Sequence, residues 1–140
     1  MRKRIRFAFL IVVLLFCVSC STKEYVGSYV VGEKMYAYLE EYFRNAGASE
    51  EEFKSAYPNI KSVQSFFGNW TITLDKNGTG SLLISDAYQD ISYKVEGKKL
   101  ITTYKSTGIT QYMGTFNDDY STLTVDWASK TMDVILEKEK

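Results

Sequence analysis

The stretch Asn69–Ser85, which reads NWTITLDKNGTGSLLIS, constrains the fold of this chain more than any other. It contains two runs of strand character, Trp70–Leu74 and Gly80–Ser85, which flank a turn at Lys76-Asn77-Gly78. The Asn-Gly pair favours a tight primed turn, because both residues tolerate a positive φ. The sequence therefore predicts an antiparallel hairpin here, and short strands alternate with turns from this point to the C-terminus.

Apolar side chains recur at every second residue after Phe67, which is the period of a strand with one buried face. The inward positions predicted from this alternation are Trp70, Ile72, Leu74, Ile91, Tyr93, Val95, Leu100, Thr102, Tyr104, Leu123, Val125, Trp127, Met132, Val134 and Leu136. A further strand is expected over Ile109–Phe116 and an opening strand over Glu24–Val31. About eight strands at this spacing predict a mainly β fold, a meander that closes into a small antiparallel barrel. Closure removes the exposed sheet edges of an open meander.

A helical insertion interrupts the strand pattern after the first strand. Apolar residues spaced by three and four predict a helix over Glu33–Ala46, which Gly47 ends. Ser49 and Glu52 match a capping box, so a second short helix is expected over Glu50–Ala56. The segment Asn59–Ser65 fits a helix or a strand equally well.

The N-terminus has the form of a secretory signal peptide. A basic cluster over the first six residues precedes the apolar run Phe7–Val18, which ends at a small residue, Ser19. This run of about 12 residues is too short for a membrane-spanning helix, which needs roughly 20.

The sequence Cys17-Val18-Ser19-Cys20 resembles the lipobox of bacterial lipoproteins, although that family usually has leucine where Cys17 stands. The resemblance implies that Cys20 becomes the N-terminus and carries acyl chains such as palmitate. The chain would then divide into a signal peptide (1–19), a lipidated N-terminus with a short linker (20–23) and one domain (24–140). The lipid would anchor that domain to a membrane of the bacterial envelope, outside the cytoplasm. An ordinary secretory peptide, with Cys20 as a bystander, is the alternative.

Composition excludes several classes of function. Four of the seventeen basic residues lie in the first six positions, so the remaining thirteen face seventeen acidic residues, a net charge of −4. A mildly acidic surface with Arg44 as its one arginine argues against binding to nucleic acid. The chain has no histidine, which excludes Ser-His-Asp catalysis and histidine-ligated zinc. No disulfide framework is possible beyond Cys20.

The strand pattern as a whole resembles small lipocalin-like domains of bacterial lipoproteins. The similarity rests on the opening segment Tyr25–Tyr29, the helical insertion, the hairpin Leu74–Gly80 and the closing strand pairs. It implies an up-and-down barrel of about eight strands with two short helices after the first strand. It carries no catalytic signature and no ligand.

One spacing suggests a metal site. The calcium loop of an EF-hand supplies oxygen ligands at fixed positions, and a similar spacing occurs at Asp75, Asn77, Thr79, Gly80 and Asp86. The flanks are strand sequences rather than helices, and a paired strand would pull Asp86 roughly 17 Å from the turn. A plain hairpin is therefore the favoured interpretation, and no metal or cofactor is expected.

Aromatic residues are the remaining candidates for a site. The set considered as ligand-binding comprises Tyr25, Tyr29, Trp70, Tyr93, Tyr104 and Trp127. Core or rim packing is the simpler interpretation of these positions, since an eight-stranded barrel is either filled or holds one small ligand. We expect a non-enzymatic, membrane-tethered binding domain. It would hold a small apolar ligand inside the barrel or, alternatively, recognise an envelope protein through its surface.

Overall fold

Eight antiparallel strands close into an up-and-down barrel in the computed structural model, which describes residues 23–126 and 132–140. The strands are β1 (Gly27–Val31), β2 (Thr71–Leu74), β3 (Thr79–Ile84), β4 (Ala87–Glu96), β5 (Lys99–Tyr104), β6 (Thr110–Phe116), β7 (Thr122–Val125) and β8 (Val134–Lys138). Each strand pairs with the next, and β8 returns to pair with β1, where Leu136 lies opposite Val31. The predicted fold class is confirmed.

The hairpin of β2 and β3 is confirmed, but its turn differs from the prediction. Gly78 has a φ of 79°, whereas Asn77 keeps a negative φ, so the turn is not of the primed type. The Asn77 side chain instead accepts hydrogen bonds from the backbone N–H and the hydroxyl of Thr79. The primed geometry occurs in the next turn, where Ser85 and Asp86 have φ values of 48° and 67°.

Alternating side chains fill the interior of the barrel, as the two-residue period predicts. Those that are fully buried or nearly so are Tyr29, Ile72, Leu74, Leu82, Ile91, Leu100, Thr102, Leu123, Val125 and Leu136. Two glycines let neighbouring strands approach closely. A Cβ at Gly80 would lie 2.1 Å from the carbonyl oxygen of Thr73, and a Cβ at Gly114 would lie 2.4 Å from that of Thr124.

Three helices follow β1, where two were expected. They are α2 (Glu33–Asn45), α3 (Glu50–Ala56) and α4 (Ile60–Phe67). The capping box of Ser49 and Glu52 forms as predicted. The third helix occupies the segment that the sequence left open, and Asn59 and Ser62 cap it reciprocally. Ser62 stands where the usual capping box has Glu or Gln, so the sequence lacked the full signal, and the apolar spacing alone fitted a helix or a strand.

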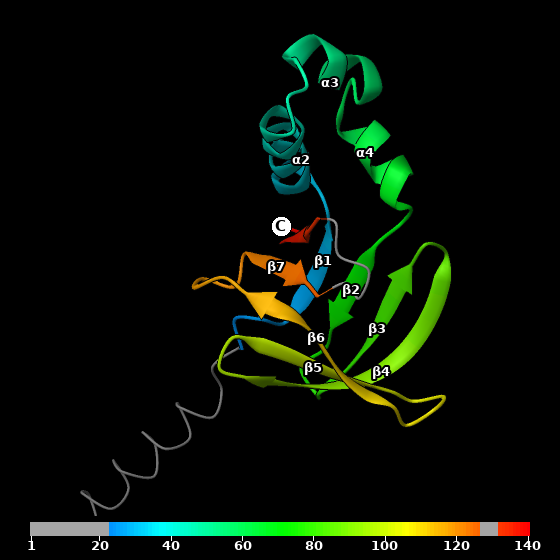
Figure 1. Ribbon diagram of the computed structural model, residues 1–140. Coiled ribbons are helices and arrows are strands. Elements are labelled where there is room, and N and C mark those ends of the chain that lie inside the picture. The colour runs from blue at the N-terminus through cyan, green and yellow to red at the C-terminus, as the bar shows by residue number, and fades with distance from the viewer. Residues whose placement is uncertain (1–22, 127–131) are drawn as a thin grey trace, which may run out of the picture.

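The three helices form a helical arm (residues 32–68) that projects beyond one end of the barrel, with α3 farthest from the strands (Figure 1). Buried Met35, Leu39, Phe53 and Val63 form the core of the arm. Several hydrogen bonds tie the arm to the barrel. Among them, the Tyr38 hydroxyl accepts from the backbone N–H of Asp133 at 3.1 Å, and Gln64 donates to the Val31 carbonyl at 2.9 Å. None of the described helices has the length and apolar content that crossing a bilayer requires.

Candidate functional site

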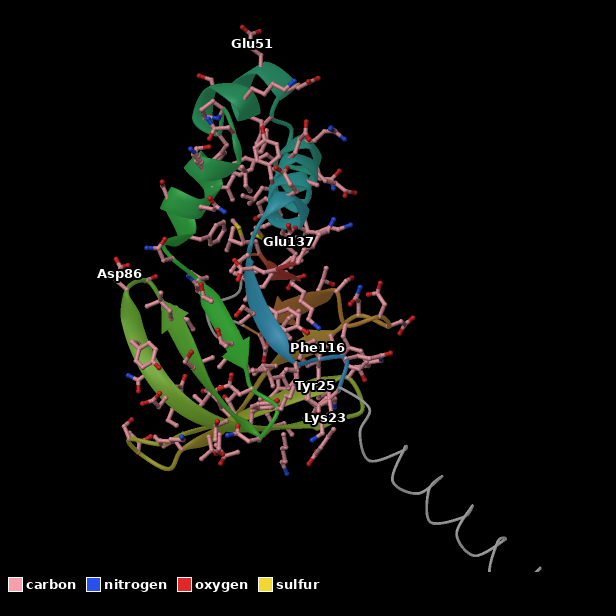
Figure 2. The ribbon with its side chains drawn as sticks, turned by 180° about the vertical axis from the view of Figure 1, so that it is seen from behind. Lys23, Tyr25, Glu51, Asp86, Phe116 and Glu137 are labelled. Carbon is pink, nitrogen blue, oxygen red and sulfur yellow. The ribbon has the colours of Figure 1, made fainter. Side chains whose placement is uncertain are left out.

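Three of the predicted aromatic residues meet at the end of the barrel opposite the helical arm. Tyr25 and Phe116 lie at that end (Figure 2), and the rings of Tyr29, Tyr93 and Tyr120 contact one or both of them. We call these five residues the tyrosine cluster. The ring centroid of Tyr25 lies 6.1 Å from that of Tyr93, 6.3 Å from that of Phe116 and 5.9 Å from that of Tyr120. The rings therefore pack on one another across this end of the barrel.

Hydrogen bonds fix the hydroxyl groups of the cluster. The Tyr29 hydroxyl lies 3.0 Å from the carbonyl oxygens of both Tyr25 and Tyr120, and its one proton is shared between them. The Tyr93 hydroxyl donates to the carbonyl of Asp75. Burial raises the pKa of Tyr29, with smaller contributions from Tyr93 and Tyr120. Burial also raises the pKa of Tyr93 to about 12. Both phenols therefore keep their protons above pH 10, where an exposed tyrosine would ionise.

The other predicted aromatic residues lie elsewhere. Trp70 is only 4% exposed and immediately precedes β2, near the helical arm. Tyr104 is half-buried on β5, and its hydroxyl accepts a hydrogen bond from Gln111 at 2.7 Å. Trp127 and the predicted lipidation site Cys20 fall outside the described residues. The structure therefore brings together three members of the predicted set.

The two aspartates of the calcium-like spacing lie at opposite ends of one strand. Asp75 belongs to the turn before β3 and Asp86 to the turn after it, and the six residues of β3 span about 20 Å. Asp86 instead accepts a hydrogen bond from the side-chain amide of Asn69 at 3.3 Å. Within residues 23–126 and 132–140, no three cysteine or acidic side chains gather as metal ligands. The geometry matches the plain hairpin that the sequence favoured.

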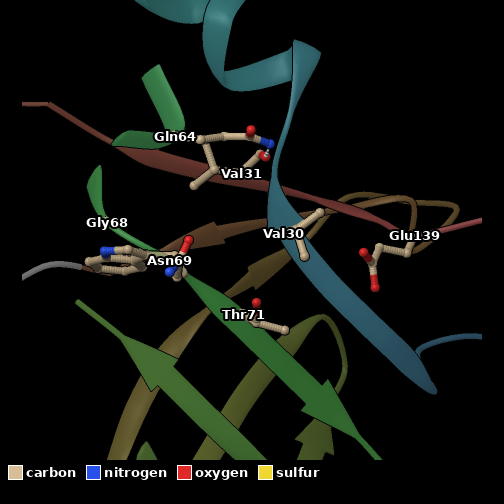
Figure 3. Close-up of a pocket in the computed structure, with 8 residues that line it drawn as sticks. Val30, Val31, Gln64, Gly68, Asn69, Thr71 and Glu139 are labelled. Carbon is tan, nitrogen blue, oxygen red and sulfur yellow. Dashed lines mark hydrogen bonds between the residues drawn. The ribbon is translucent and has the colours of Figure 1, made fainter. Parts of the chain in front are cut away.

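A hollow of about 210 Å³ lies where the helical arm joins the barrel (Figure 3). We call it the junction groove, and the residues that line it are Val30, Val31, Gln64, Gly68, Asn69, Trp70, Thr71 and Glu139. Val30 and Thr71 are paired across β1 and β2. Beyond that pair the two strands separate to accommodate the arm, and this separation opens the groove.

Two amides and one carboxylate are the polar side chains with the longest reach in the groove. Gln64 uses one side-chain N–H to hold the Val31 carbonyl, and Asn69 uses one to hold Asp86, so each amide keeps its oxygen and a second N–H. The exposed carboxylate of Glu139 stands at the other side of the groove (Figure 3). The carboxylate of Glu139, with the two amide oxygens, suits a cationic group such as an ammonium or a guanidinium.

Gly68 shapes the rim of the groove. Its φ is 71°, and a Cβ there would lie 3.1 Å from the backbone Cα of Ser85, so a larger residue would be strained and crowded. Sequence reasoning missed this groove, because Gln64 and Glu139 are far apart in the chain and neither belongs to a recognisable motif. The one local signal is Gly68-Asn69 directly after the apolar end of a helix.

An exposed aromatic side chain lies between two groove residues in the sequence, Gln64 and Gly68. Phe66, on α4, is 61% exposed, and its ring contacts those of Phe67 and Tyr57, with centroids 5.0 Å and 5.8 Å away. Phe66 thus gives the arm an exposed apolar side chain on the same helix as Gln64 of the groove.

Comparisons with known protein families, curated proteins and solved structures found no match. Inferences about function therefore rest on the geometry and sequence of this chain.

Proposed function

We propose that this chain is a non-enzymatic, lipid-anchored binding domain of the bacterial envelope that recognises a partner protein through the surface around the helical arm. The anchor is the acylated Cys20 of the lipobox-like sequence, and the barrel is the lipocalin-like scaffold that the strand pattern suggests. One observation carries the proposal. The described barrel interior is occupied by the protein's own side chains, whereas a groove and an exposed phenylalanine lie at the arm and its junction with the barrel.

This arrangement favours the surface-acting alternative over a small apolar ligand inside the barrel. Such a ligand would need an internal space of roughly 300 Å³ or more. The inward positions hold large side chains such as Tyr29, Ile72 and Leu100, each with no exposed area. The tyrosine cluster packs across one end of the same interior.

The chemistry of the arm suggests the kind of partner. Phe66 offers an apolar anchor, and the junction groove offers the carboxylate of Glu139 with two amide oxygens for a lysine or arginine side chain. The net charge of −4 outside the first six residues also favours a basic partner surface. A volume of about 210 Å³ fits one such side chain better than a whole small molecule.

Site-specific photo-crosslinking in cells that naturally express the protein tests this proposal. A photo-reactive residue at position 66 should give a discrete protein adduct, and Glu139→Gln in the same chain should reduce its yield several-fold. Tyr88 is a matched control, because it is also 61% exposed but lies on β4 of the barrel. Equal adducts from positions 66 and 88, or an adduct that is insensitive to Glu139→Gln, would contradict recognition at the arm.

The anchor has its own test. Replacement of Cys20 by alanine should move the protein from the membrane fraction to the soluble fraction. If the Cys20→Ala protein stayed in the membrane fraction, the lipid anchor would be wrong.

A further inference from the structure

The position at which the chain enters the barrel distinguishes the two ends of the molecule. We propose that the tyrosine-cluster end lies against the phospholipid headgroups and that the helical arm points away from the membrane. This inference rests on the proposed lipid anchor and adds to it the face that meets the bilayer.

The first argument is the reach of the linker. Lys23 is the first described residue and lies at the tyrosine-cluster end, whereas Glu51 lies at the far end of the helical arm (Figure 2). Only Ser21 and Thr22 stand between Cys20 and Lys23, and three peptide units reach at most about 11 Å. With its acyl chains in the bilayer, Cys20 would hold this end of the barrel close to the headgroups.

The second argument is that the residues after the linker are fixed to the barrel. The backbone N–H of Val26 donates to the Lys23 carbonyl at 3.1 Å, and the Lys138 ammonium donates to the Glu24 carbonyl. The ring of Tyr25 packs within the tyrosine cluster. A tether that begins at a fixed point restricts the orientation of the domain as well as its distance from the membrane.

The third argument is the composition of this end. The Lys98 ammonium lies 3.7 Å from the ring centroid of Tyr120 and donates to the Asp118 carbonyl at 2.8 Å, and the Lys23 ammonium lies 5.9 Å from the ring centroid of Tyr25. Tyrosine and lysine side chains each combine an apolar part with a polar end, so both are suited to the headgroup region of a bilayer.

The loops at the tyrosine-cluster end carry both lysines and aspartates. Asp75, Asp118 and Asp119 accompany the lysines at this end. Electrostatic attraction to anionic lipid is therefore weak, and the anchor maintains the contact by keeping the local concentration high.

The arm then faces outward. Its first helix alone has 13 residues and spans about 20 Å, and α3 lies farther still from the barrel (Figure 1). The junction groove and Phe66 both belong to the side of the molecule that would be presented away from the lipid.

Fluorescence quenching in vesicles tests the orientation. The chain has no cysteine after Cys20, so Lys76→Cys, in the loop after β2, and Glu51→Cys, on α3, each give one labelling site in the acylated protein. Each labelled protein is inserted into phosphatidylcholine vesicles in which some headgroups carry a nitroxide quencher. We expect quenching at position 76 to be several-fold stronger than at position 51. Equal quenching, or stronger quenching at position 51, would overturn the orientation.

The controls separate this inference from the anchor itself. The Cys20→Ala versions of both proteins should show the same low quenching, because they lack the lipid. If the acylated chain fails to float with the vesicles, the proposed anchor is wrong. If it floats and the two positions are quenched equally, the anchor stands and the orientation is wrong.

Discussion

The carboxylate of Glu137 accepts a hydrogen bond from the backbone N–H of Lys34 at 2.9 Å, and the two residues are 103 positions apart in the sequence. This contact replaces a missing cap, because the residue at the N-cap of α2 is Gly32, which has no side chain to accept a hydrogen bond. A Cβ at Gly32 would lie 2.3 Å from the Glu137 carboxylate, so glycine is what allows the close approach. The pair connects the base of the helical arm to the last strand of the barrel.

Loss of this cap should destabilise the protein. Glu137→Ala removes the acceptor and the favourable charge at the start of α2, and we expect the free energy of unfolding to fall by about 1 kcal/mol. The measurement is equilibrium denaturation in urea. Glu139→Ala is the matched control, since that exposed side chain lines the groove, and its effect should stay within about 0.5 kcal/mol. Equal losses in the two variants would contradict the capping role.

The close approach of strands at Gly80 gives a second prediction. Gly80→Ala places a methyl group 2.1 Å from the backbone oxygen of Thr73, so we expect a loss of about 3 kcal/mol or more in the free energy of unfolding. Gly97→Ala is the comparison, because no atom lies within 4 Å of its Cβ position and only its φ of 62° is unfavourable, which costs about 1 kcal/mol. Thermal and urea unfolding should rank the two variants in that order. The reverse order would show that the strand contact is not tight.

The core contains a polar group, the Thr102 hydroxyl, whose removal should stabilise the protein. Thr102 has no exposed area, and its hydroxyl has no hydrogen-bond partner among the described residues. Thr102→Val keeps the shape and removes the unpaired hydroxyl, so we expect the free energy of unfolding to rise by about 1 kcal/mol. Thr103→Val is the neighbouring control. The exposed hydroxyl of Thr103 shares a hydrogen bond with that of Thr110 at 2.7 Å, so its removal should not stabilise the protein. A destabilised Thr102→Val protein would indicate a hidden partner.

The tyrosine cluster predicts sensitivity to alkaline pH. The pKa of Tyr93 rises to about 12 in the folded protein, from about 10 in an unfolded chain, because burial disfavours the phenolate. A raised pKa means that the folded state holds the proton more tightly. The stability from this group is complete below pH 10 and declines between pH 10 and 12.

Tyr93→Phe tests this directly. The variant should be less stable than wild type at pH 8 by about 1 kcal/mol, because it lacks the hydrogen bond to the Asp75 carbonyl. Between pH 10 and 12 its stability should decline less steeply than that of wild type, with a remaining slope from Tyr29, whose pKa is also raised. Urea unfolding at a series of pH values measures both effects. Parallel curves for the two proteins would show that Tyr93 does not contribute to the alkaline loss.

Local patterns in the sequence determined much of the fold. The two-residue period defined the strands and their inward side chains, and the Ser49–Glu52 capping box located α3 to the residue. These signals are reliable because each depends on neighbours within a few positions of the chain. The helix at Ile60–Phe67 lacked a strong signal of this kind, and the sequence left it undecided.

Tertiary structure alone decided which residues meet. Barrel closure brings Tyr25, Tyr93 and Tyr120 together at one end but leaves Trp70 at the other. The junction groove joins Gln64 to Glu139 only because β1 and β2 separate beyond Val30 and Thr71. Periodicity says which face of a strand a side chain occupies, whereas register and closure set its neighbours on that face. The sequence by itself therefore predicted the barrel, whereas only the three-dimensional arrangement decided that its inward side chains fill it and which residues meet at the junction groove.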